Sequence, residues 1–354
     1  MNSLTGVKES NILKTDKLYE LDYMRFIACL AVMIVHITAT GVTGYIYGSL
    51  PHIVSLMVNR SFKFTTPIFI FLSGVTSFYS YRKKEFKYMP FIIKRLEKVL
   101  IAYFVWCVIY YAVYIKLGFY SFDISFFIKS VLLGTMSYHL YFVIIITQMY
   151  IVGPMFYKLL KSSNKKILIL IVSAIITVLC AEYIRFENSD RLFLKYMFFY
   201  MLGIFVTLEY DNFILWINKF KVLITAGYVI ISVLYTMVSY YNLTIYMFVW
   251  FAFSIFSVFF IYYVGLIMKK SLDKVYSFIK LFGQSSYYIY LMHPLVLTLM
   301  ILYTDKYGIL SITKRLIIYS ATVIPVTIIT CLLFTAVKNN LKKNKKAASA
   351  ASTN

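Results

Sequence analysis

Charged residues are scarce in this chain, and acidic ones most of all. Only 14% of its 354 residues are Asp, Glu, Lys or Arg, about half the share usual in soluble proteins, while 61% are hydrophobic. The 4 Cys stand singly in apolar runs, without a disulfide framework or zinc-type spacing. The chain also has no H-E-x-x-H, G-x-S-x-G or Walker-type glycine loop. These absences argue against a soluble globular domain, a metalloprotease and a nucleotide-driven pump.

Long apolar runs are what the sequence has in their place. About 20 apolar residues are enough to cross a bilayer as a helix. We therefore predict an all-α, polytopic membrane protein with about ten transmembrane helices, at residues 21–44, 64–81, 91–115, 138–158, 167–184, 193–209, 221–240, 244–267, 284–303 and 314–337. One further apolar segment, 121–134, is too short to cross and contains Asp123 and Lys129. We predict a short interfacial or re-entrant helix there, lying on the surface.

The basic residues are distributed unevenly between the two sets of loops. One set carries 25 Lys and Arg and the other carries 10, and positive loops stay in the cytoplasm. We predict a multi-pass plasma-membrane protein with both termini cytoplasmic. Its parts would be an N-terminal segment 1–20, a membrane domain 21–338 and a basic tail 339–354 ending in a coil, AASAASTN. Because this topology accounts for the net charge of +22, we expect no nucleic-acid partner.

The first predicted span, LDYMRFIACLAVMIVHITAT, contains two ionisable side chains, Arg25 and His36. Eleven residues at 100° each return to nearly the same helix face, with a rise of about 16 Å. That rise resembles the reach of a pantetheine arm between its phosphates and its thioester. Arg binds phosphate through its planar fork, and His takes and returns a proton near neutral pH. Ionisable groups in a span indicate a functional site by default.

Structural roles are the alternative for both residues. Arg25 could extend to the interface and pair with Asp22, and His36 could make an interhelical hydrogen bond. His293 lies at similar depth in the ninth span, where a site and a packing role are equally open. His52 is expected in an outer loop, where solvation accounts for it.

The two residues resemble the hallmark of the acyltransferase-3 family of integral membrane O-acyltransferases, an Arg, ten intervening residues and a His in the first span. Further blocks similar to the family's follow in order through nearly the whole chain: PIFIFLSG (67–74), KRLEKVLIAYF (94–104), HLYF (139–142), YMLG (200–203) and GQSSYYIYLMHPL (283–295). Two positions depart from the pattern. Lys98 stands where a second Arg is usual and lacks its fork, and Ile101 stands where Pro is common.

The resemblance implies transfer of an acyl group, expected to be acetyl, from cytoplasmic acyl-CoA to a hydroxyl of an extracytoplasmic glycan or lipid-linked sugar, with no metal. The donor phosphates would bind at the inner mouth, to Arg25, Arg82, Lys83, Lys84, Arg95 and Lys98. His36 would act as general base or carry the acyl group as nucleophile. The cavity would be lined by Ser73, His139, Tyr150, Ser286, Tyr290 and His293.

Export of a polysaccharide or lipid-linked sugar is the alternative, because some chains of this family type are assigned to export of a poly-N-acetylglucosamine adhesin. A structural subunit among glycan-assembly proteins is a third reading. The enzyme is preferred for two reasons. A passive path needs no Arg and His one pantetheine length apart, and no span shows the Gly/Pro-interrupted helix pairs of an alternating-access transporter.

Overall fold

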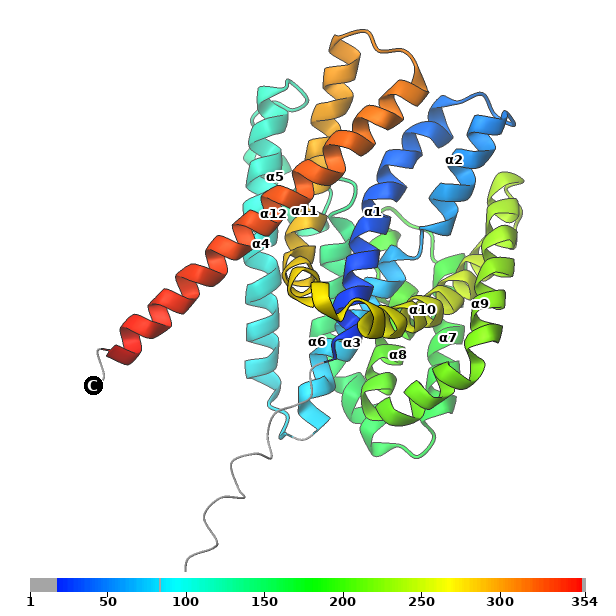
Figure 1. Cartoon of the computed structure of the whole chain (residues 1–354), viewed down its shortest axis with the longest axis vertical. Coiled ribbons are helices and arrows are strands. Elements are labelled where there is room, and N and C mark those ends of the chain that lie inside the picture. Colours follow the sequence, from blue (N-terminus) through cyan, green and yellow to red (C-terminus); the bar gives the residue numbers. More distant parts are fainter. Residues whose placement is uncertain (1–17, 83, 352–354) are drawn as a thin grey trace, which may run out of the picture.

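The computed structural model describes residues 18–82 and 84–351, so nearly all of the predicted N-terminal segment lies outside the described residues. Over these ranges the chain forms only helices and turns (Figure 1). Eight helices are long and apolar enough to cross a membrane, and they are α1 (Glu20–Gly44), α4 (Tyr88–Lys116), α6 (Tyr141–Ser162), α7 (Lys166–Tyr183), α9 (Tyr210–Tyr240), α10 (Tyr246–Ser271), α11 (Tyr276–Lys306) and α12 (Ile312–Ala351). The shorter elements are α2 (Leu50–Ser61), α3 (Thr65–Phe78), η1 (Tyr79–Arg82), α5 (Ile124–Leu133), η2 (Ser189–Arg191), η3 (Phe193–Tyr196), α8 (Met197–Leu208) and η4 (Asp273–Val275).

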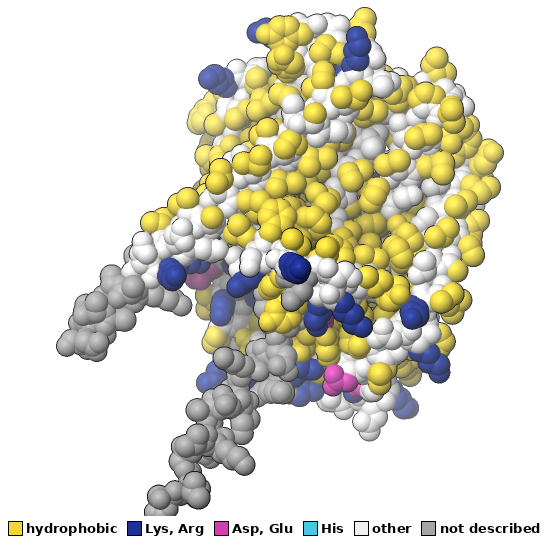
Figure 2. All heavy atoms as spheres, viewed as in Figure 1, with side chains coloured by type: hydrophobic (Ala, Val, Ile, Leu, Met, Phe, Trp, Pro, Cys, Tyr) yellow, Lys and Arg dark blue, Asp and Glu magenta, His cyan; other side chains and the backbone are white. Residues whose placement is uncertain are grey.

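The surface of the bundle is apolar. Large hydrophobic side chains point outward on several of the long helices, including Ile101, Val222 and Leu333. Figure 2 shows hydrophobic side chains over most of the visible face, with Lys and Arg gathered mainly toward its lower part. Lipid is the solvent that such a surface fits. The predicted all-α, multi-pass membrane protein is therefore confirmed.

The second crossing is interrupted, which the sequence reading missed. It consists of α2 and α3, separated by residues 62–64. Asn59 at the end of α2 donates hydrogen bonds to Val35 O (2.8 Å) and to Thr38 Oγ1 (3.1 Å), so the break lies beside the middle of α1. The outer loop expected around His52 is wrong, because His52 lies in α2. The break carries no Gly or Pro, which is why a search for those residues did not find it.

The α5 helix lies alongside α4. Asp123 caps it by accepting from the backbone N–H groups of Ser125 and Phe126. Tyr111 of α4 donates to Asp123 O (2.8 Å), and Tyr103, two turns earlier, donates to Val131 O (2.6 Å). The helix therefore turns back along α4.

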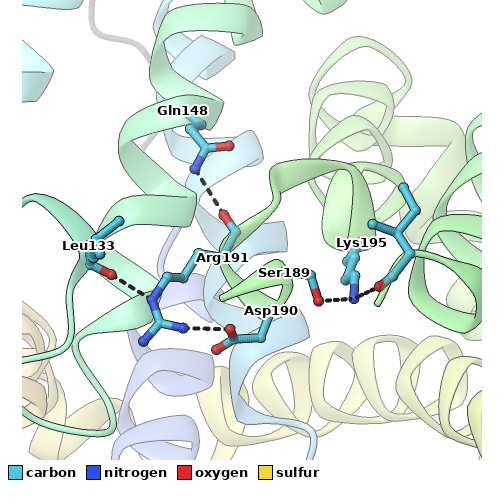
Figure 3. A network of polar contacts seen from close by, with 7 residues as sticks. Leu133, Gln148, Ser189, Asp190, Arg191 and Lys195 are labelled. Carbon is cyan, nitrogen blue, oxygen red and sulfur yellow. Dashed lines mark hydrogen bonds and ion pairs between the residues drawn. The ribbon is translucent and has the colours of Figure 1, made fainter. Parts of the chain in front are cut away.

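The loop of η2 and η3 before α8 is tied to α5 and α6 (Figure 3). Arg191 Nε donates to Leu133 O (2.5 Å), and its Nη1 pairs with Asp190 (2.5 Å). Gln148 of α6 donates to Arg191 O (2.9 Å). These contacts hold the start of α8 in place although the predicted span 193–209 is short.

Two glycines bring α3 and α8 into backbone contact. A Cβ on Gly74 would lie 2.3 Å from Tyr200 O, and one on Gly203 would lie 2.3 Å from Phe71 O. Any side chain at either position would separate the helices. The blocks PIFIFLSG and YMLG therefore meet as the two halves of one contact.

The α1 helix is central and is anchored at its N-terminal end. It contacts α2, α3, α10, α11 and α12. Glu20 is fully buried and accepts hydrogen bonds from Tyr210 (2.6 Å) and Tyr262 (3.3 Å), while Lys269 pairs with it at 3.1 Å. A buried carboxylate needs such partners. These partners fix the position of α1 along its own axis, and therefore the positions of Arg25 and His36.

The last helix is longer than predicted. α12 continues to Ala351, beyond the bundle (Figure 1), so the coil expected for AASAASTN is wrong up to that residue. Ala is the strongest helix former and nothing in the segment breaks the helix.

Candidate active site

Arg25 and His36 open into two different cavities along α1. Arg25 lines a cavity of ≈ 140 Å³, the basic cavity, whose other polar side chains are Ser73, Arg95, Lys98, Tyr150, Ser286, Tyr287 and Tyr290. His36 lines a second one of ≈ 250 Å³, the histidine cavity, together with Lys63, Thr65, Thr66, His139, Tyr141, Lys195, Tyr196, Tyr246, Trp250 and Tyr290. One helix thus connects a cationic chamber to a chamber with imidazole groups, separated by about 16 Å of helical rise.

The basic cavity gathers three cations from two helices. Arg25 pairs with Asp22 (2.9 Å), as the structural reading of Arg25 allowed, and Tyr276 donates to the same carboxylate (2.8 Å). This pair uses one guanidinium nitrogen of Arg25, and the group has five N–H donors. Arg95 of α4 is positioned by a hydrogen bond to Thr76 O (2.7 Å). Lys98, one turn further along α4, lines the same space.

The remaining predicted donor-binding residues lie elsewhere. Arg82 is on η1, with its guanidinium 4.0 Å from the ring centre of Tyr79 and 5.8 Å from that of Tyr210. Lys84 is exposed. Lys83 lies outside the described residues. Neither Arg82 nor Lys84 lines the basic cavity.

Three histidines from three separate segments lie next to one another, and His36 and His139 line the histidine cavity whereas His293 lines neither cavity. The His36 and His293 ring centres are 5.2 Å apart, and those of His139 and His293 are 5.7 Å apart. Tyr290 is packed on His139, with ring centres at 5.0 Å, and donates its hydroxyl to His139 O. The predicted residues His36, His139, Tyr290 and His293 are therefore neighbours although 257 positions separate the first from the last.

Hydrogen bonds fix the tautomer of the innermost ring. His293 is fully buried, and its Nδ1 lies 2.9 Å from Ile289 O, so Nδ1 carries the proton because a carbonyl only accepts. Its Nε2 is then left with a lone pair and no hydrogen-bond partner among the described residues. His139 Nε2 is likewise buried without one. Both nitrogens are therefore available to a ligand.

The two cavities share a wall of three aromatic side chains. Phe69 of α3, Phe142 of α6 and Tyr290 of α11 line both. Phe69 and Phe142 meet edge to face with ring centres 6.2 Å apart, and Phe142 meets Tyr290 in the same way at 5.4 Å. We call these three residues the aromatic partition. It stands between the cationic end of α1 and His36.

Sequence reasoning missed several residues of the site and misplaced another. Lys63 lies in the break between α2 and α3 and not in an outer loop, and its position between Phe62 and Phe64 was the available signal. His52, expected to be solvated, is instead buried in α2 with its ring tilted against that of Tyr47, the ring centres being 5.1 Å apart. Nothing in the spacing of Phe69 and Phe142 distinguishes them from lipid-facing phenylalanines.

Among the described residues, no group of three or more His, Cys, Asp or Glu side chains is arranged to bind a metal ion. A larger hollow of ≈ 670 Å³ lies at α7, α8 and α9. Its charged pair, Lys166 and Glu209, is already formed at 2.5 Å, and the rest of its wall is mostly apolar, so it offers no group for chemistry.

Comparison with known proteins relates the chain to acyltransferases and also to proteins named for polysaccharide export. A family model described as an acyltransferase domain matches residues 18–336. Three similar proteins carry the name "Probable poly-beta-1,6-N-acetyl-D-glucosamine export protein". Two are from Staphylococcus aureus, strains MSSA476 and MRSA252, each 25% identical and each covering 81% of this chain and 84% of its own length. One from Staphylococcus epidermidis is 24% identical, over 83% and 84%. No solved structure matches the chain.

Proposed function

Because this chain belongs to the acyltransferase-3 family of membrane proteins, we propose that it moves an acyl group from acyl-CoA on the cytoplasmic side to a sugar hydroxyl on the opposite side. The observation that carries the proposal is the pair of cavities on α1. A cationic chamber at Arg25 and an imidazole chamber at His36 share one wall. Two neighbouring cavities with a shared wall suit a reaction in which one substrate enters from each face of the membrane.

The donor side is the basic cavity. Lys and Arg gather mainly toward the lower part of the molecule in Figure 2, the end from which α1 rises in Figure 1, and the positive-inside rule assigns that end to the cytoplasm. Charge-assisted hydrogen bonds from Arg25 and Arg95 fit the phosphates of CoA. At ≈ 140 Å³ the cavity is smaller than the roughly 300–1,000 Å³ of a pocket that encloses a drug-sized ligand. It therefore takes the narrow pantetheine end, while the nucleotide stays at the mouth.

The acceptor side is the histidine cavity. His36 removes the proton from the acceptor hydroxyl, the hydroxyl oxygen attacks the thioester carbonyl, the carbon–sulfur bond breaks, and the CoA thiolate leaves and takes up a proton. His139 and His293 hold the His36 ring in a fixed environment. Tyr290 lines both cavities and donates its hydroxyl to His139 O, so its role in the proposal is to position the His139 segment. A covalent acyl group on His36 is the other chemical route, and mass spectrometry of the protein trapped with donor alone distinguishes the two.

Export is the second candidate function, and one structural feature favours it. The interrupted crossing formed by α2 and α3 borders the histidine cavity, and broken helices at mid-membrane are typical of transporters. The relatives named as export proteins point in the same direction. We nevertheless prefer transfer, because a sugar path has no use for a cationic chamber, whereas a donor bound there by its phosphates can extend its narrow pantetheine arm past the aromatic partition to His36.

The replacement His36→Ala tests the proposal. We expect acyl transfer from labelled acyl-CoA to a sugar acceptor, measured with purified protein in lipid, to fall at least about 100-fold, because Ala offers neither base nor nucleophile. His52→Ala is the matched control, since it removes another histidine of α1–α2 that lines neither cavity. Turnover close to the unmodified protein in His36→Ala would refute the role of His36. In cells, normal ester per sugar with greatly reduced surface glycan would favour export instead.

A further inference from the structure

The histidine cavity contains a cation that no part of the proposed mechanism uses. Lys63 lies in the break between α2 and α3, and its side chain lines the cavity that His36 lines. Asn59, one turn earlier, is hydrogen-bonded to Val35 O at 2.8 Å, so the chain around Lys63 is held beside the His36 turn of α1. A lysine at this depth is costly unless a partner compensates it.

The part of the chain that the structure describes supplies no carboxylate as such a partner. Among residues 18–82 and 84–351 no carboxylate pairs with Lys63, and the wall of the cavity contains no Asp or Glu. The other lysine of this wall, Lys195, is in a different situation. It donates to Ile184 O (2.7 Å) and Ser189 Oγ (3.2 Å) and so closes the end of α7 (Figure 3). Lys195 is thus a structural cation, whereas the charge of Lys63 is available to a ligand.

The rest of the wall fits a sugar. Tyr141, Tyr196, Tyr246 and Trp250 line the same cavity, and amphipathic rings of this kind combine apolar contact with hydrogen bonding. At ≈ 250 Å³ the space suits about one sugar ring with its substituents.

We propose that Lys63 forms an anion subsite beside His36, and that the acceptor is a sugar carrying an acidic group, phosphate or carboxylate, close to the hydroxyl that is acylated. This inference rests on the proposed transferase function and adds the chemical class of its acceptor. The ammonium of Lys63 binds the acidic group, which brings a hydroxyl of the same ring to His36. A neutral sugar would leave the lysine uncompensated, and a cationic, de-acetylated amino sugar would be repelled.

Binding to the purified protein tests the subsite without any turnover. The probes are N-acetylglucosamine 1-phosphate, the methyl glycoside of N-acetylglucosamine and inorganic phosphate, each titrated by calorimetry. We expect the sugar phosphate to bind about 10-fold to 100-fold more tightly than the methyl glycoside, as a charge-assisted hydrogen bond provides. Lys63→Met should abolish that difference, Lys63→Arg should keep most of it, and Lys63→Gln repeats the neutralisation if the Met variant does not fold. The control is Lys116→Met, which removes an exposed lysine at the end of α4.

Three results would overturn the subsite. These are equal affinities for the two sugars in the unmodified protein, a phosphate preference that survives Lys63→Met, and inorganic phosphate alone binding as tightly as the sugar phosphate. Failure of the transferase function looks different. In that case His36→Ala leaves acyl transfer unchanged, whatever the binding data for Lys63 show.

Discussion

The aromatic partition predicts how donor and acceptor chemistry are coupled. Phe142 touches both other members of the partition, with ring centres 6.2 Å from Phe69 and 5.4 Å from Tyr290. Phe142→Ala removes the central ring and joins cavities of ≈ 140 and ≈ 250 Å³. A vacated ring leaves a space of order 100 Å³, enough for a few waters at about 30 Å³ each. The polar groups of the histidine cavity would hold those waters next to the thioester path.

We expect Phe142→Ala to hydrolyse acyl-CoA in the absence of acceptor and to lose about tenfold in transfer to sugar, since water competes for the acyl group and the acceptor is less well positioned. The change in stability should stay below the roughly 3–5 kcal/mol of a fully buried Phe→Ala, because Phe142 is only partly buried. The assay measures thioester cleaved per sugar ester formed, alongside the thermal midpoint.

Two further variants sharpen this test. Phe142→Leu refills most of the space and should restore the ratio of thioester cleaved to ester formed. Phe186→Ala removes a phenylalanine of which 61% is exposed, outside both cavities, and should change neither quantity. A ratio in Phe142→Ala equal to that of the unmodified protein would refute the partition as a barrier, even if total activity fell.

Two other outcomes follow from the same geometry. Gly74→Ala places a Cβ 2.3 Å from Tyr200 O, and α3 and α8 can relieve this clash only by moving apart by nearly 1 Å. We expect the free energy of unfolding to fall by about 1–3 kcal/mol, measured by thermal unfolding. The control is Ala112→Val, a larger addition at an exposed position of α4, and an equal loss of stability in this variant would contradict the prediction. Arg25→Lys should weaken binding of a non-hydrolysable CoA analogue about tenfold, because a point charge replaces the planar guanidinium in the basic cavity. Added salt should weaken binding further, since the contacts are between charges. Both effects are measured by calorimetric titration, and an affinity unchanged by the substitution and by salt would exclude binding of the donor at Arg25.

Several features were decided by the sequence alone, because they depend on local order. Apolar runs of about 20 residues make the chain a helical membrane protein wherever they pack. The positions of Arg25 and His36 on one helix face follow from 100° per residue. The order of the short blocks was enough to predict the family, since each block carries its own residues. Even the ion pair of Arg25 with Asp22 was foreseeable, because residues three apart on a helix are neighbours.

Contacts between distant segments were decided only by the tertiary structure. The break at residues 62–64 contains no Gly or Pro, and Asn59 beside it donates a hydrogen bond to Val35 O of α1. The local sequence therefore gives no indication that a helix ends there. His293 reaches His36 because α11 packs on α1, and His139, in the turn before α6, lies against His293. Phe69 and Phe142 become a partition because α3 packs on α6. In a chain where apolar residues face both lipid and core, hydrophobicity no longer tells inside from outside. Which phenylalanine lines a cavity, and which lysine stands beside a histidine, is therefore fixed by helix packing alone.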